Sequence, residues 1–228
     1  MKQQAEKSNE LLRQGTQYLL GRGARRDEKK GRELIVQAAE LDNPDAMHLA
    51  YMMLAHGQGG PFDRKKAFQF LKRAAELGHL EATYILGYCY IAGGMGNNGY
   101  STEILNQQPV PMDEEKGLKY LYDAADRGHS LAALRIAEHW EDRAEDEPEF
   151  LERAVMWYEK GVALGEPNCL IHLADFHILG KVLPKDPKKA RKMYKQAAKS
   201  DDICARSTAK QRLEEFDELE TLLMENYS

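Results

Sequence analysis

The sequence predicts an all-α fold, a right-handed α/α superhelical solenoid made of tandem helix pairs. Three observations support this prediction. A small-residue pattern returns along the chain, a second pattern alternates with it in a constant register, and apolar residues within both recur at helical spacing. We therefore expect residues 1–228 to form a single repeat domain.

The first pattern joins a lysine and a small residue to two small residues that begin eight positions after the lysine. It is clearest where Lys66-Ala67 precede Ala74-Ala75. The other copies are Lys30-Gly31 with Ala38-Ala39, Lys116-Gly117 with Ala124-Ala125, Lys189-Ala190 with Ala197-Ala198 and, more weakly, Arg153-Ala154 with Gly161-Val162. Successive copies are separated by 36, 50, 37 and 36 residues, so the third unit carries an insertion, placed at 94–112.

The second pattern lies between these copies and places a small residue three positions before a large one. It occurs at Leu86-Gly87 with Tyr90, Gln14-Gly15 with Tyr18, Leu49-Ala50 with Met53, Ile136-Ala137 with Trp140, and Leu173-Ala174 with His177. Small side chains let two helix backbones approach closely, and one helix pair cannot bury its apolar face alone, so neighbouring pairs must stack. The two patterns predict five repeats over about 8–200 and a C-terminal capping helix over about 203–224.

Capping residues mark the helix ends that these repeats require. Four aspartates stand three residues before an anchor lysine, where a carboxylate accepts from unpaired backbone N–H groups at a helix start: Asp27, Asp63, Asp113 and Asp186. Three glycines follow the second helices, where a left-handed residue often ends a helix: Gly78, Gly128 and Gly165. Each unit is therefore predicted to be a helix, a turn, a helix and a short turn.

These motifs resemble those of the Sel1-like repeat family, a branch of the tetratricopeptide-like α-solenoids. Residues 82–93 (ATYILGYCYIAG) resemble the first half of that repeat, and residues 63–78 (DRKKAFQFLKRAAELG) resemble the second half. The resemblance covers about 8–200, with departures at Gln14 and Gly31 in repeat one and at Phe150, which replaces the capping aspartate of repeat four. It implies a non-catalytic adaptor or scaffold that binds a partner protein or peptide in a concave groove.

Composition argues against several other classes. The net charge of −5, without a basic domain, does not favour nucleic acid as a partner, and no apolar run approaches the length of a membrane span. The opening residues lack the apolar core of a signal peptide. Cys89, Cys169 and Cys204 have no metal-ligand spacing and are interpreted as reduced thiols of a cytoplasmic protein. We expect no metal and no cofactor, and a monomer is slightly favoured over an oligomer.

Motifs for catalysis are weak. Ser207 and Lys210 match the S-x-x-K motif of penicillin-recognising enzymes, but the companion Ser-Asp-Asn and Lys-Thr-Gly motifs are missing. A β-lactam-binding hydrolase is therefore a remote alternative, and we expect the chain not to be an enzyme. A second alternative within the binding class is a dedicated inhibitor or immunity-type protein that neutralises a toxin or an enzyme.

The resemblance also implies a binding face. In tetratricopeptide arrays the first helices line the concave side, and positions −2, +2 and +5 from the Leu-Gly leucine are expected to point into it. These positions are Met47, Tyr51, Leu54, Tyr84, Tyr88, Ile91, Leu134, Glu138, Glu141, Ile171, Asp175 and Ile178. Tyrosine and methionine are enriched in interfaces, and the acids favour a basic partner, although such side chains at helical spacing are also typical of a core. Further contacts are expected from Tyr100, Ile104 and Leu105 in the insertion, unless that loop only tolerates sequence drift.

Overall fold

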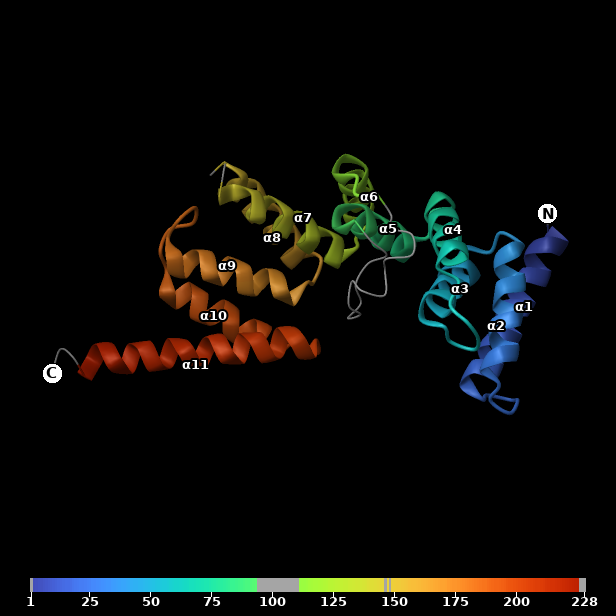
Figure 1. Ribbon diagram of the computed structural model, residues 1–228. Helices are drawn as coiled ribbons and strands as arrows, with labels where there is room; N and C mark the ends of the chain where they lie inside the picture. Colours follow the sequence, from blue (N-terminus) through green and yellow to red (C-terminus); the bar gives the residue numbers. More distant parts are fainter. Residues whose placement is uncertain (1, 94–110, 146, 148, 226–228) are drawn as a thin grey trace. The chain divides into compact units, whose positions relative to one another are not determined.

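The computed structural model describes residues 2–93, 111–145, 147 and 149–225, without the side chains of 145 and 219–225. Over these residues the chain forms eleven α-helices, one short 3₁₀ helix (η2, Arg143–Glu145) and no strand, so the all-α prediction is confirmed (Figure 1). The α-helices are α1 (Lys2–Leu20), α2 (Glu28–Glu40), α3 (Pro44–His56), α4 (Arg64–Glu76), α5 (Leu80–Ala92), α6 (Glu114–Asp126), α7 (Ser130–Asp142), α8 (Phe150–Ala163), α9 (Pro167–Leu179), α10 (Pro187–Ala197) and α11 (Ile203–Glu225).

The chain divides into two compact units, Met1–Arg127 and Gly128–Ser228. In the first unit α1–α2, α3–α4 and α5–α6 form helical hairpins, and α2 packs on α3 while α4 packs on α5. In the second unit α7–α8 and α9–α10 form hairpins, α8 packs on α9, and α10 packs on α11. Hairpins packed in series are the arrangement that the repeats predict. The assignment of the whole chain to one domain of five repeats and a cap stays a prediction.

Small residues bring the two helices of a hairpin into backbone contact. A Cβ atom added at Gly117 of α6 would lie 2.9 Å from the carbonyl oxygen of Gly87 in α5, and one at Gly87 would lie 3.0 Å from the oxygen of Gly117. Gly15 of α1 and Gly31 of α2 form the same contact, at 2.9 and 3.0 Å. The other hairpins have fully buried alanines at the corresponding positions: Ala50, Ala67, Ala137, Ala154, Ala174 and Ala190. The predicted close approach is therefore confirmed where glycines meet.

All four predicted aspartate caps are present. The carboxylate of each aspartate accepts a hydrogen bond from the backbone N–H of the lysine three residues later, at 2.9 Å for Asp27 and Asp186 and 3.0 Å for Asp63 and Asp113. Helix α8 has no aspartate at this place, and Glu149 before it makes no side-chain cap bond. The first residue of α8, Phe150, instead packs against the Trp140 ring, with ring centroids 5.0 Å apart.

Removal of one aspartate cap is expected to destabilise the first unit. Replacing Asp63 with alanine leaves the N–H of Lys66 without its acceptor, and we expect a loss of about 1 kcal/mol in the free energy of unfolding. Chemical denaturation followed by circular dichroism measures this loss. Asp63→Asn should retain most of the stability, and Glu149→Ala should change little because Glu149 makes no cap bond. Equal stabilities for the alanine variant at 63 and the wild type would contradict the assignment.

The predicted left-handed glycines end the second helices. Gly78, Gly128 and Gly165 have φ values of 85°, 94° and 89°. In the first repeat a non-glycine residue, Asp42, takes this conformation with φ of 60°. Aspartate is among the few residues that tolerate the left-handed region, because its short polar side chain bonds locally.

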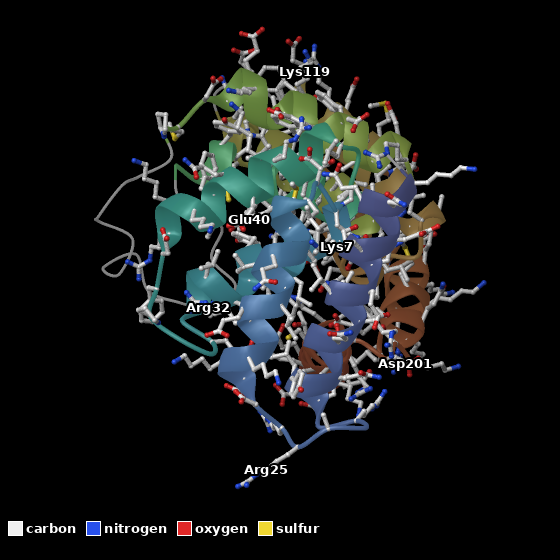
Figure 2. All side chains as sticks on the ribbon, turned by 90° about the vertical axis from the view of Figure 1, so that its right-hand side faces the viewer. Lys7, Arg25, Arg32, Glu40, Lys119 and Asp201 are labelled. Atoms are coloured by element: carbon white, nitrogen blue, oxygen red, sulfur yellow. The ribbon has the colours of Figure 1, made fainter. Side chains whose placement is uncertain are left out.

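Turns between the helices of a hairpin also contact the neighbouring hairpin. The guanidinium of Arg32 in α2 donates from Nη2 to the carbonyl oxygen of Pro61 in the α3–α4 turn, at 2.7 Å. Figure 2 shows Arg32 at this edge of the first unit, whereas Arg25, in the α1–α2 turn, extends away from the helices. In the described part of the chain no helix combines the length and apolar character that crossing a membrane requires.

Candidate partner-binding site

The predicted binding-face residues lie at two depths. Five are buried, with 3–5% of their surface exposed: Met47, Tyr51, Leu54, Leu134 and Ile171. Seven are half-buried: Tyr84, Tyr88, Ile91, Glu138, Glu141, Asp175 and Ile178. The buried five belong to the cores of the two units and offer a partner little surface, so the predicted face narrows to the half-buried seven, whose partner contact stays a prediction. Tyr100, Ile104 and Leu105 lie outside the described residues.

Three acids of the predicted face already have partners within the second unit. Glu138 pairs with Arg135 at 2.6 Å. Glu141 accepts a hydrogen bond from the Tyr158 hydroxyl and lies 3.3 Å from Nδ1 of His172. Asp175 accepts from the Tyr194 hydroxyl and lies 3.6 Å from Nε of Arg212 in α11. Because these charges are compensated inside the chain, they attract a basic partner less strongly than the sequence alone suggests.

Glu141 is the centre of a small polar cluster that joins α7, α8 and α9. The Tyr158 side chain is fully buried, and its ring stacks on the imidazole of His172, with centroids 4.5 Å apart and planes 11° from parallel. Burial opposes ionisation of Glu141, but hydrogen bonds from His172 and Tyr158 outweigh it and lower the pKa of the carboxyl group. Burial also opposes protonation of His172, but the Glu141 carboxylate outweighs it and raises the imidazole pKa. The cluster therefore favours a carboxylate beside an imidazolium.

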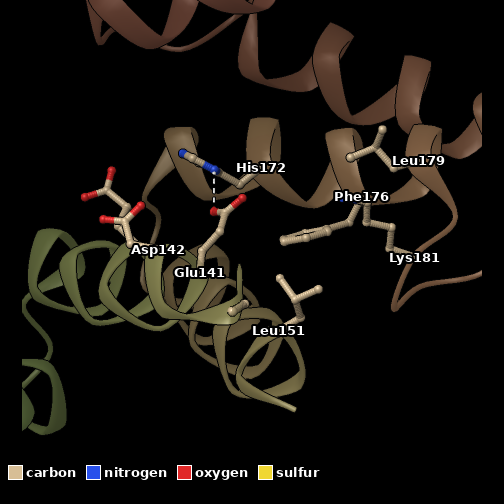
Figure 3. Close-up of a pocket in the computed structure, with 9 residues that line it drawn as sticks. Glu141, Asp142, Leu151, His172, Phe176, Leu179 and Lys181 are labelled. Carbon is tan, nitrogen blue, oxygen red and sulfur yellow. Dashed lines mark ion pairs between the residues drawn. The ribbon is translucent and has the colours of Figure 1, made fainter. Parts of the chain in front are cut away.

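A pocket of about 740 Å³ opens beside this cluster within the second unit. Its size is in the range of small-molecule and side-chain binding sites. The pocket is lined by Glu138, Glu141, Asp142, Ala144, Leu151, His172, Phe176, Leu179 and Lys181. Figure 3 shows Asp142 on one side of the Glu141–His172 pair, and Leu151, Phe176, Leu179 and Lys181 on the other. The pocket thus has an acidic end and an end that is mainly apolar.

The repeats are identified by comparison with known families. The Sel1 repeat model matches residues 15–43, 46–79, 80–101, 95–129, 151–166 and 167–202, which together make up well over half of the chain. This chain belongs to the Sel1 repeat family. The fold of that family is typical of protein–protein interaction modules, and the family is generally a non-catalytic scaffold.

Solved structures show the same Sel1 fold. A Sel1 repeat protein from Oxalobacter formigenes is 24% identical, with a TM-score of 0.71 over 87% of this chain and 75% of that one. A protective antigen of uropathogenic Escherichia coli strains with an SLR fold is 23% identical, with a TM-score of 0.68 over 89% of this chain and 40% of the antigen. A Sel1 repeat protein from Klebsiella pneumoniae is 15% identical, with a TM-score of 0.50 over 94% and 96% of the two chains. At these identities the likeness concerns the fold alone, and no curated protein matches the sequence.

The side of α9 that lines the pocket differs from the side that the sequence pattern predicts for the binding face. His172, Phe176 and Leu179 line it, and each stands one position after a predicted residue, namely Ile171, Asp175 and Ile178. Ile171 instead packs in the cluster that α9 shares with α10 and α11. A shift of one residue turns the side chain by about 100° around a helix, so the predicted residues on α9 face α10 and α11. The spacing of His172, Phe176 and Leu179 was a signal in the sequence, but it competed with other apolar spacings on the same helix.

The S-x-x-K match lies apart from the pocket. The nine residues that line the pocket include no serine, threonine or cysteine. Ser207 and Lys210 of the S-x-x-K match are exposed on α11 and do not line it. In the described ranges no three His, Cys, Asp or Glu side chains come together as metal ligands.

Proposed function

We propose that this chain is a non-catalytic adaptor of the Sel1 repeat family that binds a partner protein, and that the pocket between α7 and α9 is one of its contact sites. The observation that carries the proposal is the open pocket of about 740 Å³, whose apolar end is formed by residues of α8 and α9 and whose acidic end is formed by residues of α7. Interaction sites are typically concave and combine an apolar centre with a few polar groups.

Leu179 supports this proposal because it is a large aliphatic side chain that remains 58% exposed. A single exposed leucine is common on protein surfaces, but this one adjoins Phe176 and Leu151 at the pocket wall. A partner side chain placed here would remove apolar surface from water without any rearrangement of the core. The energy of binding would come from that burial.

The proposal includes the half-buried face of the first unit as a separate contact. Tyr84, Tyr88 and Ile91 share one side of α5 and are only partly covered. We also propose a cytoplasmic location, since none of Cys89, Cys169 and Cys204 forms a disulfide, as is usual where thiols stay reduced. The oligomeric state most consistent with this proposal is a monomer whose contacts are made to a different protein.

Affinity capture with matched variants tests the proposal. Leu179→Glu places a charge at the apolar end of the pocket, while Ile203→Glu places one at a residue that is 72% exposed and lies outside it. From cells that contain the protein, we expect quantitative mass spectrometry to find a protein retained by the wild type and by Ile203→Glu but lost with Leu179→Glu. Both variants should keep the wild-type circular dichroism spectrum. The same captured proteins with all three baits would overturn the role of the pocket.

A further inference from the structure

The two ends of the pocket carry different uncompensated charges. In the described part of the chain no side chain pairs with Asp142, which is exposed at the end of α7. Glu138, which also lines the pocket, forms an ion pair with Arg135, and Glu141 is paired with His172. At the other end Lys181 is exposed and also lacks a partner among the described residues. The pocket therefore presents a carboxylate at one end and an ammonium group at the other.

Apolar surface lies on the Lys181 side of the pocket. Phe176 forms its floor from α9 and is almost fully covered, with 3% exposed, so its position is fixed by the core. Leu151 of α8 packs against the same cluster, and Leu179 is the exposed member. In Figure 3 these three side chains converge on one side of the Glu141–His172 pair. A fixed aromatic floor with aliphatic walls is suited to one aliphatic or aromatic side chain of a ligand.

Charge complementarity determines which charged group of a ligand fits the pocket beside that apolar side chain. A cation is attracted to Asp142, which forms no ion pair with any described residue, and is repelled at the apolar end by Lys181. The attraction is confined to one end of the pocket because the other acids of the face are paired. This narrows the expectation of a generally basic partner to a single basic group in a defined place.

We infer that the pocket binds a segment of a partner protein in which one apolar side chain is followed or preceded by one lysine or arginine. The apolar side chain contacts mainly Leu179 and Leu151, together with the small exposed part of Phe176, and the basic group pairs with Asp142. Lys181 determines which end of the pocket each side chain occupies, since it repels the basic group from the apolar end. This inference rests on the proposed function, because it specifies the ligand of the same pocket.

A phage-displayed library of random short peptides, selected on the full-length chain, provides the probe. One selected peptide is then labelled with a fluorophore, and its dissociation constant is measured by anisotropy. Asp142→Lys is expected to weaken binding about tenfold, and Leu179→Ala about fivefold or more. Matched controls change the same charge or the same kind of side chain outside the pocket: Glu159→Lys on α8 and Ile203→Ala on α11, each with less than a twofold effect expected.

Charge reversal on both sides gives the sharpest test. A peptide whose basic residue is replaced by glutamate should bind the wild type weakly and regain affinity for Asp142→Lys, and the gain should shrink at high salt. Peptides that depend on Leu179 but not on Asp142 would overturn the inference and leave the proposed pocket intact. Peptides that bind without regard to either residue, or a library that yields no binder, would count against the inference and the proposed contact site together.

Discussion

Replacing Gly161 with alanine is expected to destabilise the second unit by about 2 kcal/mol, although alanine is the better helix former. A Cβ atom at this position of α8 would lie 2.3 Å from Sγ of Cys169 in α9 and 3.7 Å from Cβ of Ala133. Cys169 is fully buried, and its Cβ atom would lie only 3.3 Å from the added Cβ, so turning the sulfur aside would not remove the crowding. Close-packed interiors resist such added volume, and the strain is expected to exceed the gain in helix propensity.

The same substitution should become favourable when Cys169 is shortened. In the double variant Gly161→Ala with Cys169→Ala, the α8–α9 contact has two alanines, as at Ala74 and Ala82 in the first unit, which are both fully buried. In the Cys169→Ala background we expect Gly161→Ala to stabilise by up to about 1 kcal/mol, the difference in helix propensity. Denaturation of all four members of the cycle measures this change of sign. An effect of the same sign and size in both backgrounds would show that the two side chains do not compete for space.

This pair shows what the sequence could and could not predict about packing. Residues eight apart meet between one hairpin and the next, and most such pairs are two alanines, as at 38 and 46, 74 and 82, and 197 and 205. The sequence is sufficient to assign Gly161 to the repeat, but only as part of a weaker copy of the pattern. Cys169, which is larger than alanine, fills the space that the missing side chain of Gly161 leaves. This match can be recognised only when the two positions are known to be in contact. Helix positions and caps follow from local residues, whereas matched volumes depend on contacts between elements.

The residues that line the pocket were harder to predict than the fold for a related reason. Helix α9 has buried residues on almost every side, including Ile171, Ala174, Phe176 and His177, so no single apolar stripe marks its outer face. Because several sets of apolar residues on this helix fit a period of 3.6, the side of α9 that lines the pocket can be misassigned by one residue. The sequence predicts the acids at 138, 141 and 175 as members of the face, but it does not predict the side chains that pair with them. Tyr158 and His172 come from other helices, and nothing in the local pattern around Glu141 indicates them.

Removing the Glu141 side chain is expected to cost about 3 kcal/mol near pH 6. Glu141→Ala leaves the buried hydroxyl of Tyr158 without an acceptor and removes the charged partner of His172. An unsatisfied buried polar group and a lost hydrogen bond to a charged group each contribute between about 1 and 3 kcal/mol, and the two losses are not fully additive. Asp142→Ala is the matched control, because the adjacent aspartate is exposed and has no partner in the described chain, so its loss should change stability little.

The dependence of this loss on pH separates the pair with His172 from the bond to Tyr158. Glutamine at 141 can still accept from the Tyr158 hydroxyl but carries no charge, so Glu141→Gln isolates the ion pair. The pKa of Glu141 is lowered from its ordinary value of 4.5, so its contribution is present above pH 4.5 and is lost as the pH falls through the lowered value. The pKa of His172 is raised from 6.5, chiefly by Glu141 and in the same direction by Glu138 and Asp175. Its contribution is complete below pH 6.5 and is lost as the pH rises through the raised value.

The difference in unfolding free energy between wild type and Glu141→Gln should therefore be largest between about pH 4.5 and 6.5 and should decrease on both sides of that window. Urea denaturation at a series of pH values measures it, and His172→Gln should reduce the same peak because the imidazolium is then absent. Tyr158→Phe should lower stability at every pH in the series, because the hydroxyl donates whether or not His172 is charged. A difference between wild type and Glu141→Gln that stays constant with pH would mean that the carboxylate and the imidazole, 3.3 Å apart, contribute no ion-pair energy to the fold.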